Sequence, residues 1–343
     1  MNRSLHRASP ARWRQSVLTI AILFCALHAR AAVPYAVGDV FAAVGNGQVK
    51  HFDPTGNLLE TLDDTTGSTY TAGMCFDAAG NLYVTNFSTA NVSKFDNSGN
   101  LVSAAFLTGL SNPESCSRDI AGDIYVGDAG SNQIKKFSSA GALLNSYTVA
   151  TEARGTDWID LAADQCTMFY TSEGSLIKRF DVCGNAQLAD FATISGPTYA
   201  FRILSNGGVL AAATSQIFQL DSTGAVVGTY TAAGKSLFFA LNRDPNGTQF
   251  WSGGLSTGTI YKYDINPTGN PPVLTFNSNY FTALGGVAVF GELTQGQPTP
   301  TPGGGPTPTP GGATAVVPML SVPMFLVLGA ALALVALFVI LRR

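Results

Sequence analysis

Charged side chains are scarce in this sequence. They make up 12% of its 343 residues, and the formal net charge at neutral pH is −3. Proteins that bind nucleic acid gather lysine and arginine into a positive field that faces the phosphates. No such field can be assembled here, so we do not expect a nucleic acid partner.

Histidine is scarcer still, with three residues in the whole chain. His6 and His28 lie in an N-terminal segment that we expect to be removed, which leaves His51 in the mature chain. Imidazole is the usual proton shuttle of enzymes. Because His51 falls inside a predicted strand beside the apolar Phe52, we expect it to be a strand-surface residue rather than a catalytic base.

The first 31 residues have the three parts of a secretory signal. A basic start precedes the apolar stretch from Ser16 to Leu27, and Ala29-Arg30-Ala31 follows it. We predict a signal peptide over 1–31, with cleavage after Ala31. A bacterial lipoprotein is not expected, because apolar sequence continues beyond Cys25.

The other end of the chain predicts an anchor. Residues 324–341 form an uncharged apolar run, long enough to cross a hydrocarbon layer of roughly 30 Å, and Arg342 and Arg343 end it on the expected cytoplasmic side. Before it, 293–316 is a linker rich in Pro, Thr and Gly that cannot bury apolar area. We therefore expect an exported body, a spacer, and a membrane-spanning segment within 317–343.

Between these ends one phrase recurs six times. Its clearest forms are Val92-Ser-Lys-Phe-Asp-Asn-Ser-Gly99 and Ile177-Lys-Arg-Phe-Asp-Val-Cys-Gly184. The spacings between the anchoring residues are 43, 42, 43, 40 and 43, and those residues are Phe52, Phe95, Phe137, Phe180, Leu220 and Tyr263. A repeat of about 40 residues is typical of a propeller with one blade per copy.

Each copy contains four short β-forming segments separated by Gly, Asn, Asp or Ser turns. The Phe-Asp-x-x-Gly phrase is predicted to be a hairpin turn between the third and fourth strands, where Gly supplies the positive φ. The fold class is therefore all-β: a six-bladed β-propeller of four-stranded blades over 32–292. Leu284–Phe290 reads as a first strand, and 37–62 as strands two to four, so we expect the two chain ends to complete one blade.

These patterns resemble known families. Gly80-Asn-Leu-Tyr-Val-Thr-Asn86 followed by Val92–Asp96 resembles the repeat of NHL-type propellers, and Tyr83-Val-Thr-Asn86 matches the YVTN repeat of surface proteins. Val317-Pro-Met-Leu-Ser321, the apolar run and the basic tail resemble C-terminal sorting signals of the PEP-CTERM and IPTL-CTERM type, although Met319 stands where the IPTL pattern has Thr. The resemblance implies a sorting protease that cuts near this motif. A permanent anchor is the alternative that stays open.

Four cysteines remain after removal of the signal peptide. The sequence contains no Cys-x-x-Cys pair, so a zinc site is not indicated. Cys166 and Cys183 fall in turns on the same face of one predicted blade, so we predict a disulfide between them, contributing about 3 kcal/mol. Cys75 and Cys116 fall in the first strands of successive blades. A second disulfide between them is possible.

Propellers usually bind ligands at the mouth of the central channel, on the face built by the loops leading into each first strand and those joining strands two and three. Polar and aromatic residues gather in three of the lead-in loops, and the ligand-binding candidates are Glu114, Arg154, Asp157, Trp158, Tyr199 and Arg202. Such a cluster suits a small polar ligand, a sugar or a Ca²⁺ ion. The alternative is that these charges only pair with one another around a wet channel.

Enzymatic alternatives also stay open. A gluconolactonase-like enzyme would hold a divalent metal with Glu114, Asp157 and either Asn86 or Asp128. A streptogramin-lyase-like enzyme would need a catalytic histidine. The favoured interpretation is an exported, surface-tethered binding module of a bacterial cell envelope, either membrane-anchored or released after C-terminal processing. Its expected partner is a carbohydrate, the extracellular matrix or an envelope protein.

Overall fold

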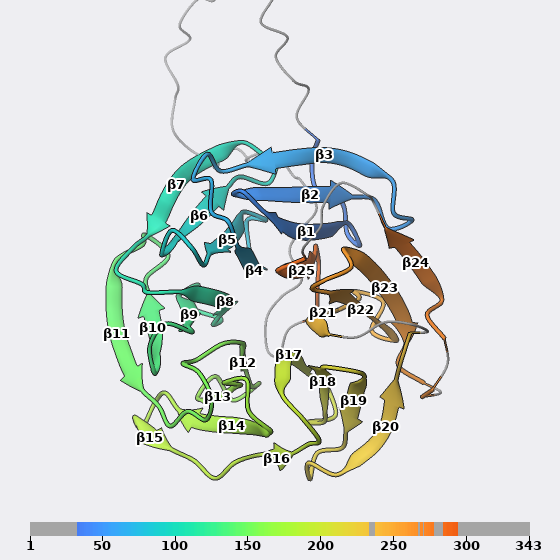
Figure 1. Ribbon diagram of the computed structural model, residues 1–343. Coiled ribbons are helices and arrows are strands. Elements are labelled where there is room, and N and C mark those ends of the chain that lie inside the picture. The colour runs from blue at the N-terminus through green and yellow to red at the C-terminus, as the bar shows by residue number, and fades with distance from the viewer. Residues whose placement is uncertain (1–32, 233–236, 267, 270, 278–283, 294–343) are drawn as a thin grey trace, which may run out of the picture. The chain divides into compact units, whose positions relative to one another are not determined.

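The computed structural model describes residues 33–232, 237–266, 268–269, 271–277 and 284–293 (Figure 1). The chain divides into two units, Met1–Gly303 and Gly304–Arg343, and every described residue belongs to the first. The predicted signal peptide, the sorting motif and the membrane-spanning segment lie outside the described residues, as does nearly all of the linker. Within the part that is described, no helix has the length and apolarity needed to cross a membrane.

The described residues form six antiparallel sheets, which are the predicted six blades arranged around a central channel. The closing blade contains β25 (Gly286–Val289), β1 (Val40–Gly45), β2 (Gln48–Phe52) and β3 (Leu58–Asp63). The second blade contains β4 (Thr71–Phe76), β5 (Leu82–Asn86), β6 (Asn91–Phe95) and β7 (Leu101–Leu107). The third contains β8 (Pro113–Arg118), β9 (Ile124–Asp128), β10 (Gln133–Phe137) and β11 (Leu143–Thr148).

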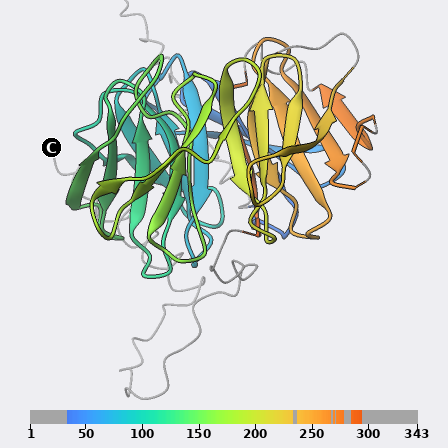
Figure 2. The same ribbon diagram turned by 90° about the horizontal axis from the view of Figure 1, so that it is seen from below.

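The fourth blade contains β12 (Ile159–Leu161), β13 (Thr167–Tyr170), β14 (Leu176–Asp181), β15 (Ala186–Gln187) and β16 (Ala192–Thr193). Its outer edge is split, since β15 and β16 both pair with β14. The fifth contains β17 (Thr198–Ile203), β18 (Val209–Ala213), β19 (Ile217–Leu220) and β20 (Val226–Tyr230). The sixth contains β21 (Phe238–Arg243), β22 (Gln249–Gly254), β23 (Thr259–Asp264) and β24 (Leu274–Asn277). Figure 2 shows the ring from a direction turned by 90°.

The repeated phrase has the predicted structural role. Its anchoring residue is buried in all six blades, because neighbouring blades pack face to face and each third strand contributes that side chain to the core. In the turn that follows, Gly56, Gly99, Gly141 and Gly224 adopt positive φ between 78° and 92°. Blade four differs, since the positive φ there belongs to Asn185, at 53°.

The ring closes as the sequence predicts. Strand β25 pairs antiparallel with β1, with Val40 opposite Val289 and Ala43 opposite Gly286. Leu284, Val287, Val289 and Phe290 are all fully buried. Pairing with β25 covers the edge of β1 that faces the channel, which an incomplete blade would leave open.

The expected surface position of His51 is wrong, because its side chain is fully buried. Its Nε2 lies 2.9 Å from Asp39 Oδ2, and its Nδ1 lies 3.1 Å from Glu60 Oε1. The same repeat position in three other blades holds lysines that also pair with an aspartate: Lys94 with Asp77, Lys136 with Asp119, and Lys262 with Asp244. The histidine is therefore the closing blade's form of a recurring ion pair.

The N-terminal segment explains why this copy is buried. Tyr35 lies edge-on to the imidazole with ring centroids 5.2 Å apart, and Phe41 stacks on its other side at 4.3 Å. In those three blades the lysine side chain stays 15 to 21% exposed. Alternation with a period of two along the strand predicts that the second face of the sheet is exposed to solvent. In a propeller that face is covered as well, so the prediction fails.

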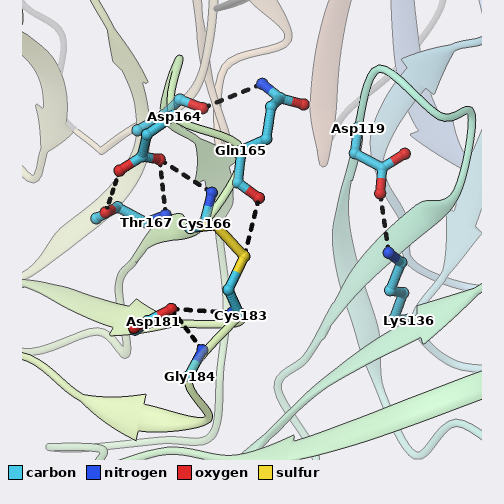
Figure 3. Close-up of a disulfide and its surroundings, with 10 residues drawn as sticks. Asp119, Lys136, Asp164, Gln165, Cys166, Thr167, Asp181, Cys183 and Gly184 are labelled. Carbon is cyan, nitrogen blue, oxygen red and sulfur yellow. Dashed lines mark hydrogen bonds and ion pairs between the residues drawn. A yellow bond between two sulfur atoms is a disulfide. The ribbon is translucent and has the colours of Figure 1, made fainter.

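Both disulfides are present. Cys166, between β12 and β13, joins Cys183, between β14 and β15, as Figure 3 shows. Cys75 in β4 joins Cys116 in β8, so this bridge links two blades across 41 residues of sequence. Chain-entropy reasoning gives contributions of about 3 and about 4 kcal/mol respectively. Both bonds favour an oxidising, extracellular environment for the domain.

Candidate functional site

The inner strands carry an irregularity at the ends where the chain enters them. In β4, β8, β17 and β21 the pairing register with the second strand shifts near the first residues of the strand. The extra residues at these bulges include Ala72, Glu114, Tyr199 and Phe239. Bulges re-aim side chains next to functional sites, and in Figure 1 these inner strands surround the channel.

Three of the bulge residues line one cavity of about 290 Å³ at this end of the channel. The cavity walls come from the loops leading into inner strands and from the loops joining second and third strands, the two classes expected to build the binding face. Among the described residues, its lining is Tyr70, Thr71, Ala72, Phe87, Glu114, Arg154, Glu173, Phe239, Leu255 and Gly285. The volume is at the lower end of the range for small-molecule sites.

Charge in the cavity centres on Arg154. Its guanidinium group donates from Nη2 to Glu114 Oε2 and from Nη1 to Glu173 Oε1, both at 2.8 Å. Its Nε lies 3.7 Å from Asp157 Oδ1. Three carboxyl groups thus surround one arginine, of which Glu114 and Asp157 are buried while Arg154 remains 32% exposed.

The carboxyl groups of Glu114 and Asp157 lie close enough to share a hydrogen bond. Neither oxygen of Asp157 accepts a hydrogen bond from any N–H or hydroxyl group in the part of the chain that the structure describes. Because two ionised carboxylates have no proton to donate, the bond requires that one of them be protonated. A proton shared by the pair would lie next to the cavity, which Glu114 lines and Asp157 does not.

Burial is the main cause of that proton's retention. It raises the pKa of Glu114 to about 7, against the opposing effect of Arg154. Burial and the neighbouring charge of Glu114 together raise the pKa of Asp157 to about 9. Two like charges side by side in a buried site cannot both ionise at low cost.

The other predicted ligand residues lie at different distances from this cluster. Trp158 is buried next to Asp157 and packs edge-on against Phe239, a cavity residue. Tyr199 also packs on Phe239, at 5.3 Å between ring centroids. Arg202 is not brought into the cluster, because its Nε donates to Glu292 Oε1 at 2.9 Å and its guanidinium group lies near Asn242.

The residues proposed to hold a metal do not converge. Asn86 donates from Nδ2 to Asp64, Asn91 and Ser93. Asp128 accepts from Lys135 Nζ and from the backbone N–H groups of Ser111 and Asn112. Each of the two is used within its own blade, so the set with Glu114 and Asp157 does not fit a common divalent cation.

Among the described residues, one group of three ligand-type side chains lies close enough for an ion: Cys166, Asp181 and Cys183. Two of the three form the disulfide of Figure 3, which leaves a single carboxylate. Gly254-Leu-Ser-Thr-Gly258 has the letters of a serine nucleophile motif. It forms the hairpin between β22 and β23, not the strand-to-helix turn that such a nucleophile needs.

Eight of the ten lining residues were not among the candidates, and four of these carry aromatic or charged side chains: Tyr70, Phe87, Glu173 and Phe239. Phe87 and Glu173 lie in loops that join second and third strands. These loops form half of the expected binding face, so a search of their residues would have found both. Glu173 has a further signal, a positive φ of 54°, unusual for a residue with a side chain. Phe239 reaches the cavity only through its bulge, which the sequence does not mark.

The buried carboxyl pair makes a prediction about pH. Because the folded pKa values exceed the ordinary values of 4.5 and 3.8, the folded protein binds these protons more tightly than the unfolded chain does. Their contribution to stability is full below the ordinary values and is lost as the pH rises toward about 9. Asp157→Asn should therefore gain roughly 2 kcal/mol relative to the unmodified protein at about pH 8, and little at about pH 4.

Urea unfolding at both pH values measures this difference. Asp190→Asn, in the same blade, removes the same charge from a carboxylate that is 37% exposed and paired with Lys178, and it serves as the control. An Asp157→Asn variant whose relative stability does not change with pH would contradict the shared proton.

Comparison with known proteins gives the fold. No protein-family model matches the chain, and no curated protein sequence matches it. Among solved structures, a chain of the nidogen/laminin complex is 15% identical, with a TM-score of 0.58 over 75% of this chain and 99% of that one. A streptogramin B lyase is 12% identical, with a TM-score of 0.53 over 72% of this chain and 85% of the lyase.

The virginiamycin B lyase of Staphylococcus aureus gives similar values: 13% identity and a TM-score of 0.53, over 73% of this chain and 84% of the lyase. At such identities the likeness concerns the fold alone. The chain is a six-bladed propeller, and its structural neighbours include both a chain of a nidogen/laminin complex and lyases.

Proposed function

We propose that this protein is an exported binding module, tethered at the bacterial cell surface, that holds a carbohydrate unit in the cavity at its channel mouth. The observation that supports it is the composition of that cavity: aromatic rings beside a pair of buried acids and an arginine, at a volume suited to a single sugar ring. Neighbouring structures do not decide the matter, since they include a complex of two matrix proteins and two lyases.

The aromatic rings and the charged side chains of the cavity would contact different parts of a sugar. A sugar ring presents C–H groups on its faces and hydroxyl groups around its rim. Tyr70, which is 55% exposed and lies edge-on to Phe87 at 6.3 Å, provides an aromatic surface for the first. Glu114, Arg154 and Glu173 provide acceptors and donors for the second.

Removing the aromatic surface tests the site. Tyr70→Ala should weaken carbohydrate binding about tenfold, which corresponds to 1.4 kcal/mol, while leaving the unfolding midpoint unchanged because the side chain is exposed. Ile120→Ala is the matched control, since Ile120 is 61% exposed in the loop that follows β8, at the opposite end of that strand from Glu114. A glycan array followed by calorimetry measures both. Equal binding by the two variants would place the ligand elsewhere.

Surface display is the second part of the proposal, and it draws on the sequence ends together with the two disulfides. Export by the predicted signal peptide would bring the cysteines to an oxidising compartment. If a sorting protease processes the tail, mass spectrometry of the mature protein should find a C-terminus near Val317 to Ser321. An intact Arg343 on surface material would instead support a permanent anchor.

The enzymatic alternative, a metal-dependent hydrolase or a lyase, has less support. Asn86 and Asp128 are engaged in hydrogen bonds with Asp64 and Lys135, and neither lines the cavity. His51 is fully buried between Asp39 and Glu60 and does not line the cavity. The binding proposal uses residues that do meet.

A further inference from the structure

The acidic side chains at the cavity outnumber the basic ones. Arg154 is paired with three carboxyl groups, those of Glu114, Asp157 and Glu173. Even with one proton shared by Glu114 and Asp157, two negative charges face one positive charge. Such a site repels an anionic ligand and attracts a cation.

Such a cation would meet Glu114 and Glu173 in the lining, and Asp157 lies next to Glu114 without lining the cavity itself. The side chain of Asp157 is 1% exposed, yet its oxygens accept no hydrogen bond from an N–H or hydroxyl donor in the described residues. A buried carboxylate normally accepts several such bonds. At present a proton shared with Glu114 takes the place of those donors.

The walls of the cavity favour an organic cation over a metal ion. Phe87 already lies under the Arg154 guanidinium at 5.2 Å, a cation–π contact. Tyr70 and Phe239 add two more aromatic rings to the same cavity. An ammonium group attached to a ring would meet carboxylates at one side and aromatic faces at the other.

We propose that the natural ligand is a sugar unit with a free, protonated amino group, such as a glucosamine residue of a deacetylated polysaccharide. The proposal rests on the function proposed above and names its ligand class. The ammonium group donates to Glu114 and Glu173, the two carboxylates that line the cavity, and the ring stacks on Tyr70. As the ammonium group arrives, the proton shared by Glu114 and Asp157 leaves to water, so the charge of the site is unchanged.

Calorimetry of the purified chain with four probes tests the proposal: oligomers of glucosamine, of N-acetylglucosamine and of glucose, and a lysine oligomer of equal charge. We expect glucosamine oligomers to bind at least tenfold more tightly than each of the others near neutral pH. The binding enthalpy should vary with the ionisation enthalpy of the buffer, because a proton is released. Affinity should fall at acid pH, where the pair keeps its proton, and at alkaline pH, where the ligand loses its charge.

Two variants separate a specific site from general attraction. Glu173→Gln should weaken binding of glucosamine oligomers about tenfold, because it removes a carboxylate of the cavity. Asp190→Asn removes the same charge at the outer edge of the fourth blade and should bind normally. Equal weakening by both variants, or equal affinity for the lysine oligomer, would overturn the proposal.

The outcomes also distinguish this proposal from the one on which it rests. If neutral oligomers bind as well as glucosamine oligomers and Tyr70→Ala abolishes binding, the ligand class is wrong and the carbohydrate site stands. If no oligosaccharide binds, both proposals fail.

Discussion

A chain that ends at Asn277 is expected to lose the folded propeller, whereas a chain that ends at Leu293 keeps it. The shorter chain lacks β25 and the residues that flank it. Leu284, Val287, Val289 and Phe290 are fully buried, and burial of such side chains contributes about 1.5 to 3 kcal/mol each. The sum, roughly 6 to 12 kcal/mol, is comparable with the whole stability of a typical domain.

The loss also has an electrostatic part. Glu292 accepts hydrogen bonds from Arg202 Nε and from the backbone N–H of Arg243, so its removal leaves the buried guanidinium group of Arg202 without this carboxylate. Removing one partner from a buried ion pair is strongly destabilising. Circular dichroism and urea unfolding should show no cooperative transition for the shorter chain.

The longer chain is the control, because it lacks most of the linker and the whole tail but retains every described residue. A second control distinguishes loss of the strand from general damage. A synthetic peptide of residues 284–293, added to the shorter chain, should restore cooperative unfolding by pairing with β1. A shorter chain that unfolds cooperatively, with an unchanged midpoint, would disprove closure by β25.

His51→Leu is expected to cost about 3 to 5 kcal/mol. Both ring nitrogens of His51 face carboxylate oxygens, at 2.9 Å and 3.1 Å, so both can donate only when the ring is an imidazolium cation. Leucine fills the space between Phe41 and Tyr35 but leaves Asp39 and Glu60 buried without their cation. The unfolding free energy in urea measures the cost.

Replacing the whole group should recover most of the loss. The triple variant Asp39→Asn, His51→Leu, Glu60→Gln removes the charges together, and a buried ion pair is often replaced without net cost. Gln48→Leu, on the same strand but at its less buried end, controls for the added leucine. A His51→Leu protein within about 1 kcal/mol of the unmodified protein would contradict a charged histidine, and so would a triple variant no more stable than the single one.

The fold was predictable because the information is repeated. Each of the six copies places an apolar anchor and a turn at the same offset, so an irregular copy does not obscure the pattern. Blade four illustrates this, since its outer edge is split into β15 and β16 and its turn uses Asn185 for the positive φ. The same alignment placed Cys166 and Cys183 in turns on one face of a blade and so predicted their disulfide, whereas it left the bridge between Cys75 and Cys116 only as a possibility.

The site was less predictable, because it depends on departures from the repeat. The bulge at Phe239 and the close approach of Glu114 to Asp157 arise where six inner strands converge, and no single copy encodes that convergence. Glu114, Arg154 and Asp157 were found because charge is scarce elsewhere. Arg202 was chosen for the same reason, and its carboxylate partner, Glu292, comes 90 residues later in the chain.

His51 shows why burial cannot be predicted from the pattern of one strand alone. The alternation along β2 places His51 on the other face of the sheet from Phe52. In an open sheet that face would be exposed to solvent. The burial of His51 comes from Tyr35, a residue before the first strand, so the environment of this position differs from that of Lys94 or Lys136 in otherwise similar blades.

The pairing of β25 with β1 also means that the first blade stays incomplete until the last strand has been synthesised. Ribosomes add about 5 to 20 residues per second, so roughly 10 to 50 s separate the appearance of Gly45 from that of Gly286. During that interval the edge of β1, Val-Phe-Ala-Ala from Val40 to Ala43, has no partner. An unpaired apolar edge recruits other chains. The yield of soluble protein should therefore depend on how fast the nascent chain is completed, and on whether a chaperone covers the first blade until the last strand emerges.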